Sequence, residues 1–267
     1  MKTIEIRELS AKHTPVKVAI FDFDGTISTL RCGWEQIMEK VMLRRLAPSG
    51  LPEEELLALI RAYIEESTGI QTIFQMEWLA EQVKKLCGTE PLDPWVYKDE
   101  YNEELLNMVN DRIRRLENGE AKPDEFLVRG SRRFLELLAA QGIEIYIASG
   151  TDDVDLQREA ALLAVTPMVK GIKGAPHRRK DCSKEAVIKE LVETRQLSGK
   201  ELLVVGDGKV EIMLGNEVGA VTVGVATREI NMDGTFHPKK LIKLRQAQAD
   251  YIVADFYELI RQWEIGG

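Results

Sequence analysis

The stretch Val18-Ala19-Ile20-Phe21-Asp22-Phe23-Asp24-Gly25-Thr26 carries the most informative pattern in the chain. Its first four residues form a short apolar run that is typical of a buried β-strand. The run ends at Asp22, so that two carboxylates two residues apart follow the strand. Residues with this spacing in an extended segment point the same way, and Gly25 permits a sharp turn directly after them. We therefore expect Asp22 and Asp24 to face one pocket.

Similar apolar runs recur along the chain and indicate further strands. Between most of them lie amphipathic segments of helical length. Strands that alternate with helices predict an α/β fold, Rossmann-like, with a parallel sheet flanked by helices. The expected strands are residues 18–21, 143–148, 202–205, 221–225 and 251–253, and the expected helices include residues 131–140, 154–163, 183–194 and 239–247.

The interval between the first two strands breaks this alternation. It contains helical patterns at residues 34–46, 53–66, 73–86 and 97–116, and no convincing strand. Nearly a hundred helical residues are too many for an ordinary crossover connection. The sequence therefore predicts an α/β core at residues 1–29 and 124–267, with an inserted helical subdomain at residues 30–123.

Polar residues also follow other predicted strands. In open α/β sheets, ligands bind beyond the carboxyl ends of the strands. Ser149 follows the second strand, and Asp207 follows the strand at 202–205, with Glu211 one helical turn further on. Lys184 lies near the start of a predicted helix. Each residue alone has an ordinary explanation as a turn former, helix cap or solvated charge, but their joint arrangement is far less probable by accident.

Taken together, Asp22-x-Asp24-Gly25-Thr26, Ser149, Lys184 and Gly206-Asp207 with Glu211 resemble the four motifs of the haloacid dehalogenase superfamily. The resemblance covers residues 16–29 and 125–255, and the helical insert occupies the position of that family's C1-type cap. It implies that Asp22 is the nucleophile that forms an aspartyl-phosphate and that Asp24 is the general acid and base.

The resemblance also implies roles for the remaining motif residues. Ser149 and Lys184 are expected to bind and neutralise the transferring phosphoryl group. Mg²⁺ is the expected cofactor, because close carboxylates need a cation and hard oxygen donors suit this ion. Its expected ligands are Asp22, Asp24 through its backbone carbonyl, Asp207, and Glu211 through water.

Further residues are expected to touch the substrate. The expected contacts are Phe23, Gly25, Thr26 and Gly150 in the motifs, together with Arg31 and Trp34 at the entry to the helical insert. Arg31 and Trp34 are candidates to grip a sugar or a second anionic group, although Trp34 suits the core of the insert equally well. The basic run His177-Arg178-Arg179-Lys180 fits a solvated loop better than a distal phosphate site.

Composition limits the other functions. The 267 residues carry 36 Lys and Arg against 44 Asp and Glu, a net charge of -8, which argues against a nucleic-acid partner. Cys32, Cys87 and Cys182 are widely spaced and suggest neither disulfides nor zinc. No apolar run is long enough to cross a membrane, and the start lacks the apolar segment of a signal peptide. We expect a cytoplasmic protein without a membrane partner; its oligomeric state stays open.

These observations predict an Mg²⁺-dependent phosphatase that acts on a small phosphate ester, with a sugar phosphate favoured. Asp24 supports this chemistry, because the dehalogenases and phosphonatases of the family carry a different residue there. Two alternatives stay open. One is a phosphomutase of the same fold, and the other is a weakly catalytic binding module, against which the intact set of carboxylates argues.

Overall fold

The structure, a computed structural model, describes residues 4–6, 16–180 and 184–266. The chain divides into two compact units. One comprises Met1–Cys32 and Arg115–Gly267 and contains the sheet, and the other, Gly33–Arg114, is helical. The predicted α/β class with a parallel sheet and a helical insert is confirmed.

The described part of the sheet has seven strands in the order β1-β7-β6-β5-β2-β3-β4. Neighbouring strands from β7 to β4 run parallel, and β1 pairs antiparallel with β7 at the edge. Strand β2 therefore lies between β5 and β3, near the middle of the sheet. The bounds are β1 Ile4–Ile6, β2 Val18–Phe21, β3 Glu144–Asp152, β4 Gly171–Ala175, β5 Leu202–Gly206, β6 Val221–Val225 and β7 Tyr251–Val253.

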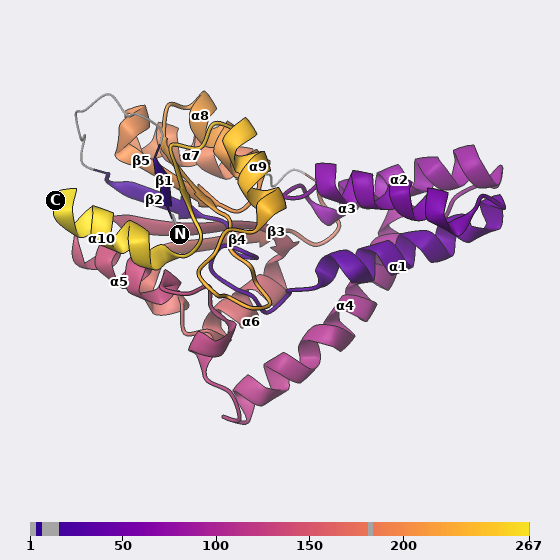
Figure 1. The fold of residues 1–267 in the computed structure, drawn as a ribbon, viewed down its shortest axis with the longest axis horizontal. Coiled ribbons are helices and arrows are strands. Elements are labelled where there is room, and N and C mark those ends of the chain that lie inside the picture. The colour runs from indigo at the N-terminus through magenta and orange to yellow at the C-terminus, as the bar shows by residue number, and fades with distance from the viewer. Residues whose placement is uncertain (1–3, 7–15, 181–183, 267) are drawn as a thin grey trace. The chain divides into compact units, whose positions relative to one another are not determined.

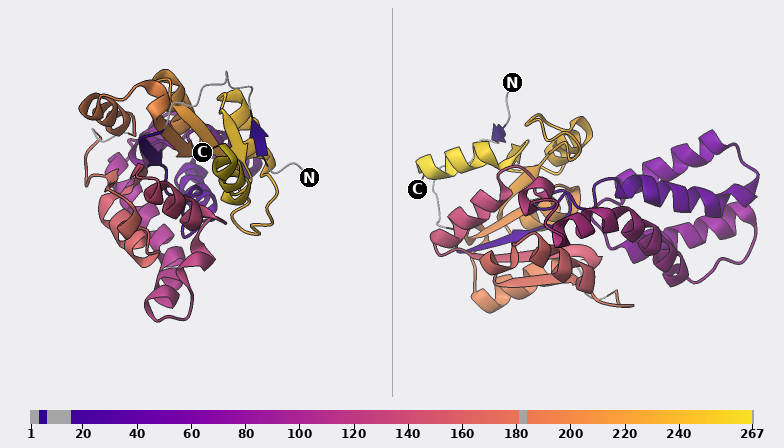
Figure 2. Two further views of the ribbon diagram at one scale, coloured as in Figure 1. Left: turned by 90° about the vertical axis from the view of Figure 1, so that its left-hand side faces the viewer. Right: turned by 90° about the horizontal axis from the view of Figure 1, so that it is seen from below.

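Helices cover both faces of the sheet (Figures 1 and 2). They are α5 Ser131–Ala140, α6 Asp153–Leu162, α7 Lys184–Arg195, α8 Lys209–Glu217, α9 Pro238–Gln246 and α10 Phe256–Gly266. Short 3-10 turns lie at Pro123–Phe126, Thr166–Met168 and Gly199–Glu201.

Strand β2 shows why the sheet needs helices on both sides. All four of its residues are buried. Ala19 and Phe21 pack into one apolar cluster with residues of α5, α6 and α10, whereas Val18 and Ile20 pack into a second cluster with residues of α7. Because successive strand residues face opposite ways, a strand that is apolar throughout has to be covered on both faces.

The helical unit contains α1 Trp34–Leu46, α2 Glu53–Glu66, α3 Thr72–Gln82 and α4 Pro94–Glu117, of which the last three residues belong to the other unit. A 3-10 turn, Ala47–Ser49, follows α1, and a π-helical turn, Val83–Cys87, follows α3. Buried Met38, Val41 and Met42 on α1 recur at helical spacing and form an apolar stripe. Side chains of α2, α3 and α4 with the same kind of burial complete the interior of this unit.

Three described strands differ from the prediction. Strands β1 and β4 were not expected; β4 reads Gly171-Ile172-Lys173-Gly174-Ala175, and its two glycines and lysine hide it from a search for apolar runs. Strand β3 continues to Asp152 instead of ending at Ala148, with a register shift against β4 between these residues. This extension carries Ser149 to Thr151 along the edge of the sheet that holds the candidate site.

Candidate active site

Asp22 and Asp207 come together because their strands are neighbours. Strands β2 and β5 are parallel, with Phe21 opposite Val205. The backbone N–H of Asp22 continues this ladder by donating to the carbonyl of Val205 at 2.9 Å. Both side chains therefore emerge at the carboxyl edge of the sheet, the usual place for ligands in this class of fold.

Lys184, the first residue of α7, bridges two of the predicted acidic residues. Its Nζ lies 2.8 Å from Oδ1 of Asp22 and also pairs with Oε1 of Glu211. All three side chains are at least nine-tenths buried. The predicted Asp22, Lys184 and Glu211 thus form one buried carboxylate-lysine-carboxylate triad.

Burial controls the protonation of this triad. Loss of solvent raises the pKa of Asp22 well above its ordinary value, and the nearby charges of Glu211 and Asp207 raise it further, while Lys184 opposes them. Burial alone would lower the pKa of Lys184, but the carboxylates of Asp22 and Glu211 outweigh it and hold the pKa above its ordinary value. Lys184 is therefore charged, and Asp22 needs cations near it to stay ionised.

Two glycines make room for these side chains. A Cβ on Gly206, at the end of β5, would lie 2.6 Å from Cβ and Cγ of Glu211, so the close approach of α8 to the strand requires glycine. Gly25 has φ +73°, and a Cβ there would collide with Oδ2 of Asp207. Substitution at either position would displace an acidic side chain of the site.

The turn after Asp24 is tied by backbone hydrogen bonds. The carbonyl of Phe23 accepts from the N–H groups of Ile27 and Ser28 at 2.8 and 2.9 Å, and the Gly25 N–H donates to the carbonyl of Ser28 at 2.8 Å. Donation by Gly25 to a phosphoryl group would therefore require this bond to break. Thr26 is fully buried, and its Oγ1 has no hydrogen-bond partner among the described residues.

Asp24 is held by hydroxyl groups from β3. Its Oδ2 accepts from Oγ1 of Thr151 at 2.7 Å and from Oγ of Ser149 at 3.4 Å. Its Oδ1 is buried and has no hydrogen-bond partner within the described residues. Thr151 was not predicted as a site residue, although it lies two positions after Ser149, the spacing that puts strand side chains on one face. Gly150 lies between them and is half-buried.

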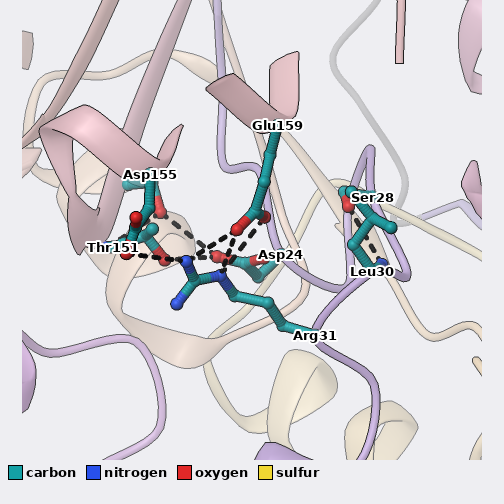
Figure 3. Close-up of polar contacts among 8 residues, drawn as sticks. Asp24, Ser28, Leu30, Arg31, Thr151, Asp155 and Glu159 are labelled. Atoms are coloured by element: carbon teal, nitrogen blue, oxygen red, sulfur yellow. Dashed lines mark hydrogen bonds and ion pairs between the residues drawn. The ribbon is translucent and has the colours of Figure 1, made fainter. Parts of the chain in front are cut away.

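Arg31 lies beside Asp24 but is engaged by carboxylates of α6. Its Nη2 lies 2.7 Å from Oε1 of Glu159 and 3.3 Å from Oδ2 of Asp155, and its Nε donates to Glu159 at 3.0 Å. Figure 3 shows these side chains gathered around Asp24 and Thr151. The role in substrate binding expected for Arg31 stays a prediction, and sequence analysis missed its partners because nothing links them locally to the motifs.

The Arg31 cluster contains a carboxyl group with an unusual pKa. Glu159 is 1% exposed, and burial raises its pKa to about 7. Arg31 lowers this value, whereas the charges of Asp24 and Asp155 raise it. Burial alone would lower the pKa of Arg31, but the surrounding carboxylates raise it above its ordinary value. The guanidinium is therefore permanently charged.

A second triad, absent from the prediction, surrounds Asp207. Lys240 of α9 places Nζ 2.6 Å from Oδ2 of Asp207 and 2.6 Å from Oε1 of Glu229. Lys240 lies 33 residues after Asp207 in the chain, outside all four motifs. No local sequence signal could have found it.

The oxygen donors of the site are of the kind that binds a divalent cation. In the described ranges, no three His, Cys, Asp or Glu side chains are arranged to hold a metal ion; Lys184 and Lys240 contact the carboxylates instead. The donor chemistry nevertheless fits Mg²⁺, which prefers carboxylate and carbonyl oxygens. Two buried carboxylate oxygens, Oδ1 of Asp24 and Oε2 of Glu211, also have no hydrogen-bond partner among the described residues. The residues present therefore fit this ion in kind.

The remaining predicted residues lie apart from these contacts. Trp34 is the half-buried first residue of α1 in the helical unit. His177 to Lys180 lie in an exposed loop that follows β4. Cys182 lies outside the described residues. Their predicted roles stay predictions.

The parallel sheet with helices on both faces and carboxylates at its carboxyl edge is typical of enzymes with a Rossmann-like α/β core. The chain belongs to the haloacid dehalogenase-like hydrolase family, whose model matches residues 16–219. The family resemblance predicted from the motifs is confirmed.

Solved structures share this fold at low sequence identity. A predicted phosphoglycolate phosphatase from Haemophilus somnus 129pt is 17% identical, with 94% of this chain and 99% of that one covered and a TM-score of 0.56. A predicted phosphatase from Clostridium acetobutylicum is 17% identical, with coverage of 93% and 98% and a TM-score of 0.59. β-Phosphoglucomutase from Clostridium difficile is 15% identical, with coverage of 92% and 96% and a TM-score of 0.59.

No curated protein matches the sequence. In the part of the chain that the structure describes, each helix is too short or too polar to cross a membrane.

Proposed function

We propose that this hydrolase is an Mg²⁺-dependent phosphatase that cleaves a small phosphate monoester through an aspartyl-phosphate on Asp22. The observation that carries the proposal is the contact between Lys184 and Asp22, 2.8 Å apart in a buried site at the carboxyl edge of the sheet. A buried ammonium beside a carboxylate suits phosphoryl transfer, because it neutralises charge on both the nucleophile and the phosphoryl oxygens.

In the first step, one oxygen of Asp22 forms a bond to phosphorus as the bond between phosphorus and the ester oxygen breaks. The leaving oxygen takes a proton from Asp24, so that the alcohol leaves neutral. In the second step, Asp24 takes a proton from water, which attacks phosphorus and releases phosphate while the Asp22 carboxylate is regenerated.

Asp24 has to keep a fixed orientation through both steps. The hydroxyls of Thr151 and Ser149 donate to its Oδ2, which leaves the buried Oδ1 as the oxygen available for proton transfer. A general acid acts best when its position is fixed within hydrogen-bond reach of the reacting atom. Ser149 has a single hydroxyl proton, so its proposed donation to a phosphoryl oxygen would replace its 3.4 Å contact to Asp24 and leave Thr151 to hold the acid.

Mg²⁺ would be held by Asp22, the backbone carbonyl of Asp24 and Asp207, with Glu211 acting through water. When bound, this ion neutralises charge on the phosphoryl oxygens and orients them for in-line attack. Its need is consistent with the raised pKa of Asp22, because a nearby cation favours the ionised carboxylate.

The helical unit Gly33–Arg114 is proposed to act as a cap that admits only small substrates. A lid of this kind excludes water and large polymers during phosphoryl transfer. A sugar phosphate is the favoured substrate class, and Arg31 and Trp34 at the entry to the unit are the candidates for contacts to the leaving group.

The test is a panel of small phosphate esters, p-nitrophenyl phosphate included, assayed for phosphate release with Mg²⁺ and with chelator. We expect metal-dependent hydrolysis that Asp22→Asn abolishes. Thr194→Val, in the exposed last turn of α7, is the matched control and should retain full activity. Absence of phosphate release across the panel would contradict the proposal, and isomerisation that exceeds release and requires a bisphosphate would indicate a phosphomutase.

A further inference from the structure

Lys240 makes contacts that none of the family motifs accounts for. Its Nζ lies 2.6 Å from a carboxylate oxygen of Asp207 and 2.6 Å from one of Glu229. The side chains of Lys240, Asp207 and Glu229 are only 16%, 11% and 15% exposed. The Coulombic attraction within contacts this close is stronger between nearly buried charges than at the surface, where water screens it.

Lys240 is fixed in this place by its surroundings. It lies in the first turn of α9, whose N-terminus is held by the His237 side chain, which accepts from the Lys240 N–H at 3.3 Å. A Cβ on Gly25 would lie 3.0 Å from Nζ, so the absence of a side chain at Gly25 leaves the space that the ammonium uses. The two carboxylates hold the pKa of Lys240 above its ordinary value against the effect of burial, which keeps the group charged.

Lys184 and Lys240 each bridge two carboxylates, but the carboxylates have different proposed roles. Lys184 pairs with Asp22, the proposed nucleophile, whereas Lys240 pairs with Asp207, a proposed metal ligand. A lysine ammonium and a divalent cation both seek the same carboxylate oxygens. Two cations on one carboxylate also repel each other, so binding of one weakens binding of the other.

We propose that Lys240 is a positioning residue that competes with the divalent cation for Asp207, and that Glu229 is the carboxylate that holds the lysine when the cation binds. Lys240 neutralises Asp207 until Mg²⁺ arrives and thereby sets how tightly the site takes up the metal. This inference rests on the proposed function, because it takes Asp207 as a metal ligand.

Opposite effects are expected from the two partners of the triad. Lys240→Met removes a positive charge next to Asp207, so Mg²⁺ should bind roughly tenfold more tightly. Repulsion from one unit charge a few ångströms away weakens the binding of a divalent ion by about this factor, even with strong solvent screening. Glu229→Gln removes the alternative partner of Lys240, so Mg²⁺ should bind several-fold more weakly.

The experiment is isothermal titration of Mg²⁺ into the intact protein at fixed ionic strength, with no substrate present. Lys239→Met is the matched control, because Lys239 is exposed on the same helix and the substitution removes the same charge. Asp207→Asn reports whether the titrated site is the proposed one. Thermal unfolding without metal adds a second measurement: Lys240→Met should lower Tm more than Lys239→Met, and Mg²⁺ should raise Tm most in Lys240→Met.

Tighter binding in Lys240→Met together with weaker binding in Glu229→Gln, each relative to Lys239→Met, would support the inference. If Lys240→Met does not fold, the Mg²⁺ affinity of Glu229→Gln decides alone: weaker binding than in Lys239→Met supports the inference, and equal or tighter binding overturns it. An affinity in Lys240→Met equal to or weaker than that of Lys239→Met would overturn the role of Lys240, while Mg²⁺-dependent phosphate release would still uphold the phosphatase. Mg²⁺ binding that Asp207→Asn leaves unchanged would overturn the metal assignment and the inference, and absence of binding in both wild type and Lys240→Met would overturn the inference as well.

Discussion

Replacement of Arg31 by methionine would leave a buried carboxylate without its main partner. Glu159 is 1% exposed, and its closest contact to the guanidinium is 2.7 Å. Removal of one member of a buried ion pair typically costs about 3 to 5 kcal/mol, whereas replacement of both members by apolar residues is often close to neutral. We therefore expect Arg31→Met to lower the free energy of unfolding by about 3 kcal/mol, and the double variant Arg31→Met/Glu159→Met to lose much less.

The cost should depend on pH, because a protonated Glu159 needs no cation. In the folded wild type its pKa is raised to about 7 by burial, against 4.5 for the free group. The folded state therefore binds more protons than the unfolded state between these values, and the contribution of Glu159 to stability falls as pH rises through them. Without Arg31 the pKa of Glu159 rises further, so the contribution of Glu159 to stability keeps falling up to a higher pH. The cost of Arg31→Met should thus be small near pH 6 and should grow above pH 7 by up to about 1.4 kcal/mol per pH unit.

Urea unfolding followed by circular dichroism at about pH 6 and about pH 9 measures both effects. Arg158→Met is the matched control, because Arg158 precedes Glu159 on α6 and pairs with Glu117 at 2.6 Å, with 50% and 44% of the two side chains exposed. We expect its cost to stay below about 1 kcal/mol. A loss in the Arg31→Met/Glu159→Met double variant as large as that in Arg31→Met, or a cost of Arg31→Met that does not change with pH, would show that Arg31 does not stabilise an ionised Glu159.

Three further substitutions test the site. Thr151→Val removes the 2.7 Å hydrogen bond to Asp24 and should lower kcat by about 10- to 100-fold with little change in KM; an unchanged kcat in steady-state assays would show that this bond does not position the acid. Gly25→Ala brings a Cβ onto Asp207 at a positive φ and should weaken Mg²⁺ binding and lower Tm, as calorimetry can measure; wild-type values for both would contradict the close approach. Lys184→Met removes the cation that lowers the pKa of Asp22, so the acidic limb of the pH-rate profile should move to higher pH. We also expect kcat/KM to fall by at least about 100-fold. An acidic limb that does not move would show that Lys184 does not keep Asp22 ionised.

Local patterns predicted the parts of the fold that depend on burial. The run Val18 to Phe21 is apolar at every position because β2 is covered on both faces, and that pattern is visible without a structure. The helices α1 and α2 match their predicted bounds because their apolar residues recur at helical spacing. Strand β4 lacks such a pattern, since its pairing with β3 at the edge of the sheet relies on backbone hydrogen bonds and tolerates glycine.

The sequence predicted the site residues that directly follow a strand. Asp22 and Asp207 follow adjacent strands, so parallel pairing alone brings them to one edge. The partners supplied by helices were not predictable, because Glu159 on α6 and Lys240 on α9 reach the site through tertiary packing. A lysine or glutamate on a helix has the same local sequence whether it faces solvent or a buried carboxylate.

Chemical trapping can detect whether Asp22 becomes covalently phosphorylated during hydrolysis. The protein would be mixed with a rapidly hydrolysed phosphate ester and Mg²⁺, quenched, reduced with borohydride, and digested for mass spectrometry. An acyl phosphate on an aspartate is reduced to homoserine, so we expect homoserine at residue 22 in the wild type, and none when substrate is omitted. Efficient hydrolysis with an intact Asp22 in every quenched sample, or with homoserine at another position, would show that Asp22 is not the nucleophile.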